Sequence, residues 1–291
     1  MTNRKLNVVR IKNQHILLIT LIVIIWGSAY PLTRIVAFYF SPFIIAEGRV
    51  LIGFLVIYTI ARNVKMGLKE AIAGILNLLF PVACLNLGVI LSENPGLVAT
   101  FIYTQPIFAV VFSYVLLQER LKSLQIIGTF IGFIGVLIAA GSTSFDLGSL
   151  VSIAGGFTWA VGTVFFKKYL QNEDLLLVYS SMSLFAFLFF IPLTVINFYY
   201  TINLYAIGLL VLLAVSAQGI GFLLWFLLIK TTGVAKASTT VLLVPACSYC
   251  VSYLLLATVP TISNVVGSAL VLFGVLLSYF DNINPQRILI K

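Results

Sequence analysis

Two charged residues, Glu47 and Arg49, lie inside one of the long apolar stretches of this sequence. Charged side chains within a membrane segment are costly and by default indicate a functional role. Residues two apart point about 200° away from each other around a helix, so each of these side chains needs a partner on another segment. Arg34, near the end of the preceding stretch, is the expected partner of Glu47. Arg49 is then left to bind a substrate carboxylate, to hold backbone carbonyl groups, or to fasten helices together.

Aromatic and amide side chains in the middle of the apolar stretches suggest the wall of a binding cavity. Gln105-Pro106 and Pro245 hold matching places in two stretches, and each proline removes a helix hydrogen bond and frees a carbonyl group. The alternative is that these groups only bend helices, anchor them at the interface or join them by hydrogen bonds. Aromatic walls with a few amides suit a small amphipathic molecule. The predicted substrate-binding residues are Trp26, Tyr30, Arg49, Tyr103, Gln105, Trp159 and Gln218.

Other reactive residues give weaker signals. Cys247 and Cys250 have C-x-x-C spacing, which places both on one helix face, where they could act as a redox pair. An apolar setting, however, makes thiols inert. The single histidine, His15, cannot supply the ligands of a metal site on its own. The sequence has no phosphate-binding loop motif. We therefore expect no catalytic residue, no cofactor and no metal.

The composition requires that these residues be positioned by membrane helices. Of 291 residues, 61% are hydrophobic and 9% are charged, whereas soluble domains have about 25% charged residues. A water-soluble enzyme is thereby excluded, and an all-α integral membrane protein is predicted. A spanning helix takes about 20 apolar residues. Ten transmembrane helices are predicted at residues 16–37, 42–61, 71–91, 96–117, 124–141, 148–167, 175–196, 204–229, 235–257 and 262–280.

The positions of Lys and Arg predict the orientation of these helices, because cytoplasmic loops are enriched in cations. Counted against the ten predicted helices, 15 of the 17 Lys and Arg residues fall on one side, including those of both chain ends. Both termini are therefore predicted to be cytoplasmic. The cations sit in short clusters between apolar runs, so the net charge of +9 does not indicate a nucleic-acid partner.

The chain also repeats itself. Pro106, Gly128 and Gly135 recur as Pro245, Gly267 and Gly274 at a constant offset of 139, and Trp26 and Arg34 recur as Trp159 and Lys167 at an offset of 133. The repeats predict two halves, residues 1–145 and 146–291, with five helices each. Because five is odd, the second half must be inverted relative to the first. Many secondary transporters use inverted repeats to alternate access to a site at the membrane midplane.

Several of these features together resemble the EamA family of the drug/metabolite transporter superfamily. They are Trp26-Gly27-Ser28-Ala29-Tyr30, Pro42 with Arg49, Gln105-Pro106 followed by Glu119-Arg120, and the glycines at 128, 132 and 135. The resemblance covers nearly the whole chain. It implies a ten-helix transporter with a central cavity between inverted halves, whose relatives export amino acids and other small metabolites or move nucleotide sugars. One departure is Thr258, which stands where the first repeat has Glu119.

The sequence therefore predicts a secondary transporter, an exporter or facilitator of amino acids or similar small amphipathic metabolites, and not an enzyme. Glu47 is the candidate coupling residue, because it is the one acid at a depth where a protonation cycle could accompany transport. The alternatives are a nucleotide-sugar exchanger of the same fold, an intramembrane thiol oxidoreductase and a non-transporting scaffold. We expect a monomer or homodimer in the plasma membrane, with the lipid bilayer and a small-molecule substrate as partners.

Overall fold

Apolar helices make up almost all of the described protein. The computed structural model describes residues 2–91, 101–141, 146–195, 198–257 and 259–280. In these ranges eight helices are long and apolar enough to cross a membrane, and two shorter apolar helices accompany them. Runs of about 20 apolar residues fold this way because hydrocarbon offers no partners for backbone polar groups, which must then be satisfied within the helix. In the described ranges the only paired extended residues are Phe40 and Tyr200, in a single antiparallel bridge.

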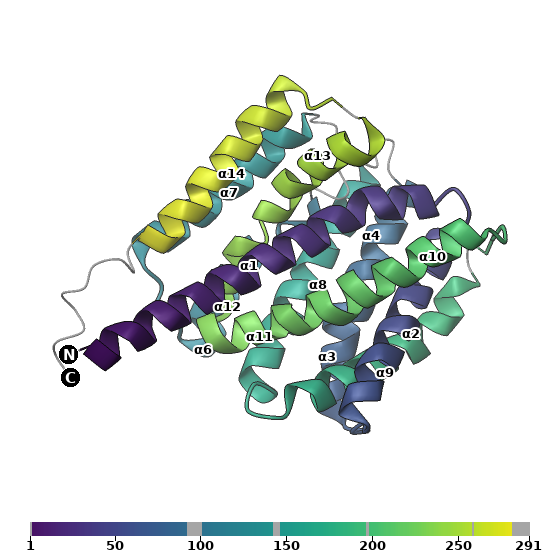
Figure 1. The fold of residues 1–291 in the computed structure, drawn as a ribbon, viewed down its shortest axis with the longest axis horizontal. Helices are drawn as coiled ribbons and strands as arrows, with labels where there is room; N and C mark the ends of the chain where they lie inside the picture. The colour runs from purple at the N-terminus through teal and green to yellow at the C-terminus, as the bar shows by residue number, and fades with distance from the viewer. Residues whose placement is uncertain (1, 92–100, 142–145, 196–197, 258, 281–291) are drawn as a thin grey trace.

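The helices follow one another along the whole chain (Figure 1). Two segments, η1 and η2, are π-helical and lie within longer helices. In chain order the elements are α1 (Thr2–Val36), α2 (Pro42–Ala61), α3 (Leu68–Gly74), η1 (Ile75–Leu79), α4 (Phe80–Leu91), α6 (Gln105–Leu117), α7 (Ser123–Ala140), α8 (Leu147–Tyr169), α9 (Leu175–Thr194), α10 (Leu204–Leu213), η2 (Ala214–Gly221), α11 (Phe222–Thr232), α12 (Val234–Thr240), α13 (Leu243–Leu256) and α14 (Ile262–Phe280).

Short polar residues fix where several helices begin. The side chains of Asp146, Asp174 and Asn203 accept hydrogen bonds from backbone amides three residues on, at 2.8, 2.8 and 3.1 Å, and so cap α8, α9 and α10. Ser41 caps α2 at 3.4 Å, and Pro42 follows it in the first turn. These helices begin within a residue of where the sequence predicts them.

Two predicted helices are not continuous. The chain turns at residues 103–104, before α6, and at residues 241–242, between α12 and α13. Each turn lies just before a proline, Pro106 or Pro245, whose ring clashes with a carbonyl group of the preceding turn and which has no N–H to donate. The span predicted at 235–257 is confirmed as one membrane-crossing segment, Val234–Leu256, but the turn divides it into two helices. The described part of the span predicted at 96–117 is likewise interrupted, and only Gln105–Leu117 follows as a shorter helix, because each proline breaks the helix rather than only bends it. Residues 96–100 of this span lie outside the described residues.

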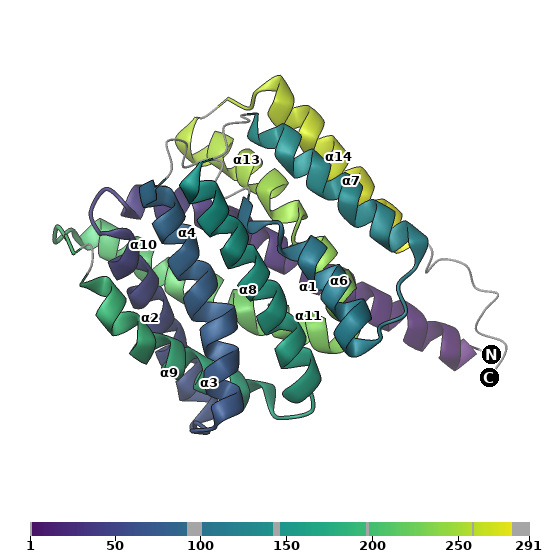
Figure 2. The same ribbon diagram turned by 180° about the vertical axis from the view of Figure 1, so that it is seen from behind.

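Helices α7 and α14 form a close pair along one side of the molecule in both views (Figures 1 and 2). A Cβ atom on Gly135 would lie 2.7 Å from the carbonyl oxygen of Gly267, and one on Gly274 would lie 2.8 Å from Cα of Gly132. Glycine is required here because the two backbones touch. Elsewhere α2 packs against α9, α4 against α8, and α1 against α13.

Two polar contacts join segments that are far apart in sequence. Glu119 Oε1 and Oε2 accept from the backbone amides of Val234 and Ala235, at 2.9 and 3.3 Å, and so cap α12. The carboxylate replaces a capping side chain that Gly233 lacks, and Gly233 has a φ of 89°, which favours glycine. In a loop, Lys65 Nζ lies 2.5 Å from Glu173 and 3.0 Å from Glu70, and these hydrogen bonds raise the pKa of Lys65.

Candidate functional site

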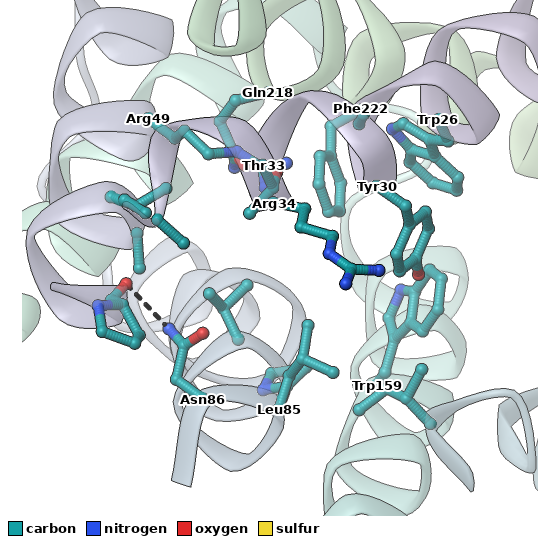
Figure 3. Close-up of a pocket in the computed structure, with 18 of the residues that line it drawn as sticks. Trp26, Tyr30, Thr33, Arg34, Arg49, Leu85, Asn86, Trp159, Gln218 and Phe222 are labelled. Carbon is teal, nitrogen blue, oxygen red and sulfur yellow. Dashed lines mark hydrogen bonds between the residues drawn. The ribbon is translucent and has the colours of Figure 1, made fainter. Parts of the chain in front are cut away.

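A cavity of about 370 Å³ opens among the helices α1, α2, α4, α8 and α11, the segment η2 and the turn before α6. Its wall is mostly aromatic and aliphatic, with a few polar side chains (Figure 3). The described residues that line it are Trp26, Ala29, Tyr30, Thr33, Arg34, Ala37, Pro42, Ile45, Ala46, Arg49, Pro81, Val82, Leu85, Asn86, Ile102, Tyr103, Trp159, Gln218 and Phe222. A concave apolar site with a small number of polar groups is the usual form of a small-molecule site.

The three tryptophans of the sequence form one cluster at this cavity. The ring centroids of Trp26, Trp159 and Trp225 are 5.8 to 5.9 Å apart, and Phe222 lies 5.1 Å from Trp26. Trp26 Nε1 donates to the carbonyl oxygen of Ala217 at 3.1 Å, which fixes its ring against η2. Trp26 and Trp159 line the cavity, so the tryptophan cluster forms a rigid apolar part of its wall.

Two tyrosines close another part of the wall. The hydroxyl oxygens of Tyr30 and Tyr103 lie 2.7 Å apart and share a hydrogen bond. Tyr30 belongs to α1, and Tyr103 belongs to the turn that the chain makes before Pro106. The hydrogen bond therefore ties α1 to the broken helix at the level of the cavity.

Two arginines line the cavity, and neither forms an ion pair with any described residue. Arg49 is half-buried in α2, eight residues into the helix, and its Nε has no hydrogen-bond partner. Arg34 extends from α1 into the middle of the cavity, whereas Arg49 lies beside Gln218 (Figure 3). A guanidinium group without a partner in such a site is suited to bind a carboxylate.

Gln218 and Asn86 supply amide groups to the wall. Gln218 lies in η2, where its backbone carbonyl accepts a hydrogen bond from the hydroxyl of Tyr179 and its Nε2 has no partner. π-helical segments frequently occur at functional sites, because the extra residue redirects a side chain. Asn86 Nδ2 donates to the carbonyl oxygen of Pro42 at 3.2 Å, so the two residues are held together at the edge of the cavity (Figure 3).

The structure brings six of the seven predicted substrate-binding residues to one cavity. They are Trp26, Tyr30, Arg49, Tyr103, Trp159 and Gln218. Gln105 is the exception, because it is fully buried outside the lining and its Nε2 donates to Ser238 Oγ at 3.1 Å. The site role of these side chains stays a prediction, but their placement no longer depends on sequence spacing.

The predicted ion pair between Arg34 and Glu47 was wrong. Glu47 does not line the cavity, and its Oε2 accepts a hydrogen bond from Thr194 Oγ1 at 2.5 Å, on α9. The turn of α2 that aims Arg49 at the cavity necessarily aims Glu47 away from it, as their spacing requires. Glu47 therefore meets α9, and Arg34 is left free of it. The coupling role of Glu47 stays a prediction.

Sequence reasoning missed Arg34, Asn86 and Phe222 as lining residues. A signal for Arg34 was present, because Trp26, Tyr30 and Arg34 are spaced four apart and so share one face of α1. Asn86 carried the same signal as Gln218, an amide within an apolar stretch, whereas the place of Phe222 depends on how α11 packs. The cysteines are free, and none of Cys84, Cys247 and Cys250 lines the cavity.

Comparisons with known proteins agree with this architecture. The model of the EamA-like transporter family matches residues 13–141 and again residues 146–280. An uncharacterized transporter of Bacillus subtilis, YvbV, is 27% identical over 285 residues, which cover 91% of this chain and 92% of that protein. A protein of Escherichia coli named a probable amino-acid metabolite efflux pump is 25% identical, over 89% of this chain and 93% of that protein. A solved crystal structure superposes with a TM-score of 0.81 at 18% identity, over 96% of this chain and 99% of the other.

Proposed function

The chain belongs to the EamA-like transporter family, and we propose that it is a secondary transporter, an exporter or facilitator of amino acids or similar small amphipathic metabolites. One observation carries the proposal. A cavity with aromatic walls and an unpartnered arginine, Arg49, lies within a bundle of apolar helices. An arginine at that depth is costly unless a ligand or a partner uses its charge.

Within this proposal the two halves are inverted repeats that contribute five membrane helices each. Several structural features recur at the offset of 139 residues found in the sequence. The π-helical segments begin at Ile75 and Ala214, and two helices end in left-handed residues at Gln118 and Ala257. These recurrences support the division into residues 1–145 and 146–291.

The glycine contacts between α7 and α14 support the inverted relation of the halves. Gly128 meets Gly274, and Gly135 meets Gly267. In the repeat, Gly128 corresponds to Gly267 and Gly135 corresponds to Gly274, so a two-fold rotation converts each contact into the other. The first glycine of α7 meets the last glycine of α14, so the two helices run antiparallel, as a two-fold axis in the membrane plane requires. Alternating access then arises from rocking of one half against the other.

The size of the cavity supports a small substrate. A volume of about 370 Å³ is near the lower end of the range of about 300 to 1,000 Å³ for ligand sites. It suits a metabolite of amino-acid size better than a nucleotide sugar. The relative from Escherichia coli, named for amino-acid metabolite efflux, supports the same class.

The proposed setting is the plasma membrane, with both termini cytoplasmic. The cation-rich loops support this orientation. The start of α1 and the end of α14 also lie toward the same end of the molecule in both views (Figures 1 and 2).

The test is counterflow in proteoliposomes, with labelled amino acids exchanged against an internal panel of amino acids and nucleotide sugars. We expect saturable exchange with the unaltered protein. Arg49→Ala should abolish exchange, and Arg49→Lys should restore little of it, because an ammonium group cannot bind a carboxylate through two parallel hydrogen bonds.

The matched control is Arg120→Ala, which removes an exposed arginine outside the cavity and should leave exchange intact. Normal exchange by folded Arg49→Ala would refute the role of Arg49. Absence of exchange of every compound by folded, unaltered protein would refute the transport proposal.

A further inference from the structure

We infer that the cavity selects organic anions: small molecules with an apolar or aromatic body and a carboxylate, but no compensating ammonium group. The inference rests on the transport function proposed above, and within that substrate class it ranks metabolites with a net negative charge above zwitterionic amino acids.

The first argument is the charge of the wall. Arg34 and Arg49 both line the cavity, and none of the described lining residues is acidic. Neither guanidinium group has an ion-pair partner in the described ranges. A bound carboxylate would reduce the repulsion between like charges and could accept two parallel hydrogen bonds from an arginine.

The second argument is the kind of polar atom that the wall leaves unsatisfied. Among the described lining residues, the buried side-chain atoms without a hydrogen bond are Arg49 Nε, Trp159 Nε1 and Gln218 Nε2. All three are N–H donors, and buried donors are costly to leave unpaired. A carboxylate is purely an acceptor, whereas an ammonium group is purely a donor and would pair with none of them.

The third argument is that the acidic residues of the described ranges are all engaged elsewhere. Glu47 accepts from Thr194, Glu119 caps α12, Glu70 and Glu173 pair with Lys65, and Asp146 and Asp174 cap α8 and α9. No carboxylate in this part of the chain is left to meet a ligand ammonium group in the cavity. The carboxylate of a zwitterionic amino acid would therefore be attracted to the arginines of the site, and its ammonium group would be repelled by them.

The test uses three ligands with the same phenylalkyl body: 3-phenylpropanoate, phenylalanine and 2-phenylethylamine. At pH 7 they are an anion, a zwitterion and a cation. All three tryptophans belong to the cluster at the cavity, so tryptophan fluorescence of the purified full chain reports binding without a label. We expect the anion to bind at least about tenfold more tightly than phenylalanine, because the ammonium group of phenylalanine would be desolvated beside two arginines without an acceptor, and an unpaired buried charged group costs about a factor of ten or more in binding. The amine should give no saturable change.

Arg34→Gln should reduce the preference for the anion to about threefold or less, because one of the two cations is lost. Arg120→Gln, which removes an exposed arginine outside the cavity, should leave the preference unchanged. Thermal unfolding of each variant establishes that it is folded. If Arg34→Gln fails to fold, the three ligands measured on the unaltered protein still decide.

Equal or tighter binding of phenylalanine, binding of the amine, or no binding of the anion to folded protein would each overturn the inference. So would an unchanged preference in folded Arg34→Gln. Counterflow separates these failures from failure of the transport proposal. Saturable exchange of phenylalanine with no advantage for the anion would leave transport standing and overturn the anion preference. Selective binding of the anion with no exchange of any ligand would leave the anion preference standing and overturn the transport proposal.

Discussion

Arg49 shows how one residue can be placed by its helix and yet depend on tertiary contacts for its role. Its depth in α2 follows from the sequence, but its position beside Gln218 follows from the packing of α2 against η2. The residue next but one, Glu47, faces α9 instead. The two charged residues of α2 therefore lie in different environments: Arg49 lines the cavity, and Glu47 is hydrogen-bonded to Thr194.

A prediction at the residue scale concerns Gly53, which packs under Gln218. A Cβ atom on Gly53 would lie 2.9 Å from Cγ and 3.2 Å from Cβ of Gln218. These atoms are near the backbone and cannot swing aside, so Gly53→Ala should displace the amide. We expect the substrate KM in counterflow to rise several-fold.

The matched control is Gly208→Ala, whose added Cβ would meet nothing within 4 Å. That variant should leave KM unchanged and stabilise α10 by up to about 1 kcal/mol, since alanine is the better helix former. An unchanged KM in Gly53→Ala would show that Gln218 does not contact the substrate.

At the scale of helices, the broken segments before Pro106 and Pro245 matter most. Each break places a turn within the bundle, and Tyr103 at the first turn reaches the cavity. Irregular backbone in a membrane protein is tolerated where it is buried in protein or lines a cavity. The second break follows α12, whose amide end is capped by Glu119 from the first half.

This cap gives a prediction at the scale of helices. Glu119→Ala leaves the amides of Val234 and Ala235 without their acceptors, and both residues are buried. We expect the free energy of unfolding to fall by about 1 to 3 kcal/mol, measured by denaturant unfolding in detergent micelles.

Glu173→Ala is the control, because it breaks an exposed ion pair with Lys65. Exposed pairs are worth about 0 to 1 kcal/mol, so this variant should lose less stability. Equal losses in the two variants would argue against the capping role of Glu119.

At the scale of the whole molecule, the proposed inverted arrangement makes a prediction about loops. Met66 and Asn172 are exposed in loops proposed to be cytoplasmic, and Phe38 and Ile202 are exposed in loops proposed to face the other side. Single cysteines at these four positions, with Cys84, Cys247 and Cys250 replaced, can be labelled with a membrane-impermeant thiol reagent on intact cells.

We expect labelling at positions 38 and 202 without lysis, and at positions 66 and 172 only after lysis. The two members of each pair come from different halves, so they report on both repeats. Labelling of position 172 from outside, with position 66 protected, would contradict the inverted arrangement.

The sequence by itself determined that this protein is a helical membrane protein, because continuous apolar runs of about 20 residues satisfy their backbone within a membrane by forming helices. It also determined where α2, α8, α9 and α10 begin, through capping Ser, Asp and Asn residues whose effects are local. Residues such as Trp26, Tyr30 and Arg49 could be proposed for a site from their type and depth alone.

Only the tertiary structure decided which of them meet. Gln105 is an amide within an apolar stretch, as Gln218 is, yet it packs against Ser238 outside the cavity. Arg34 turns into the cavity rather than toward Glu47. The reason is physical. The face that a helix presents to a partner depends on crossing angles, breaks and π-helical segments that arise from contacts between distant parts of the chain, and such contacts leave no period in the sequence.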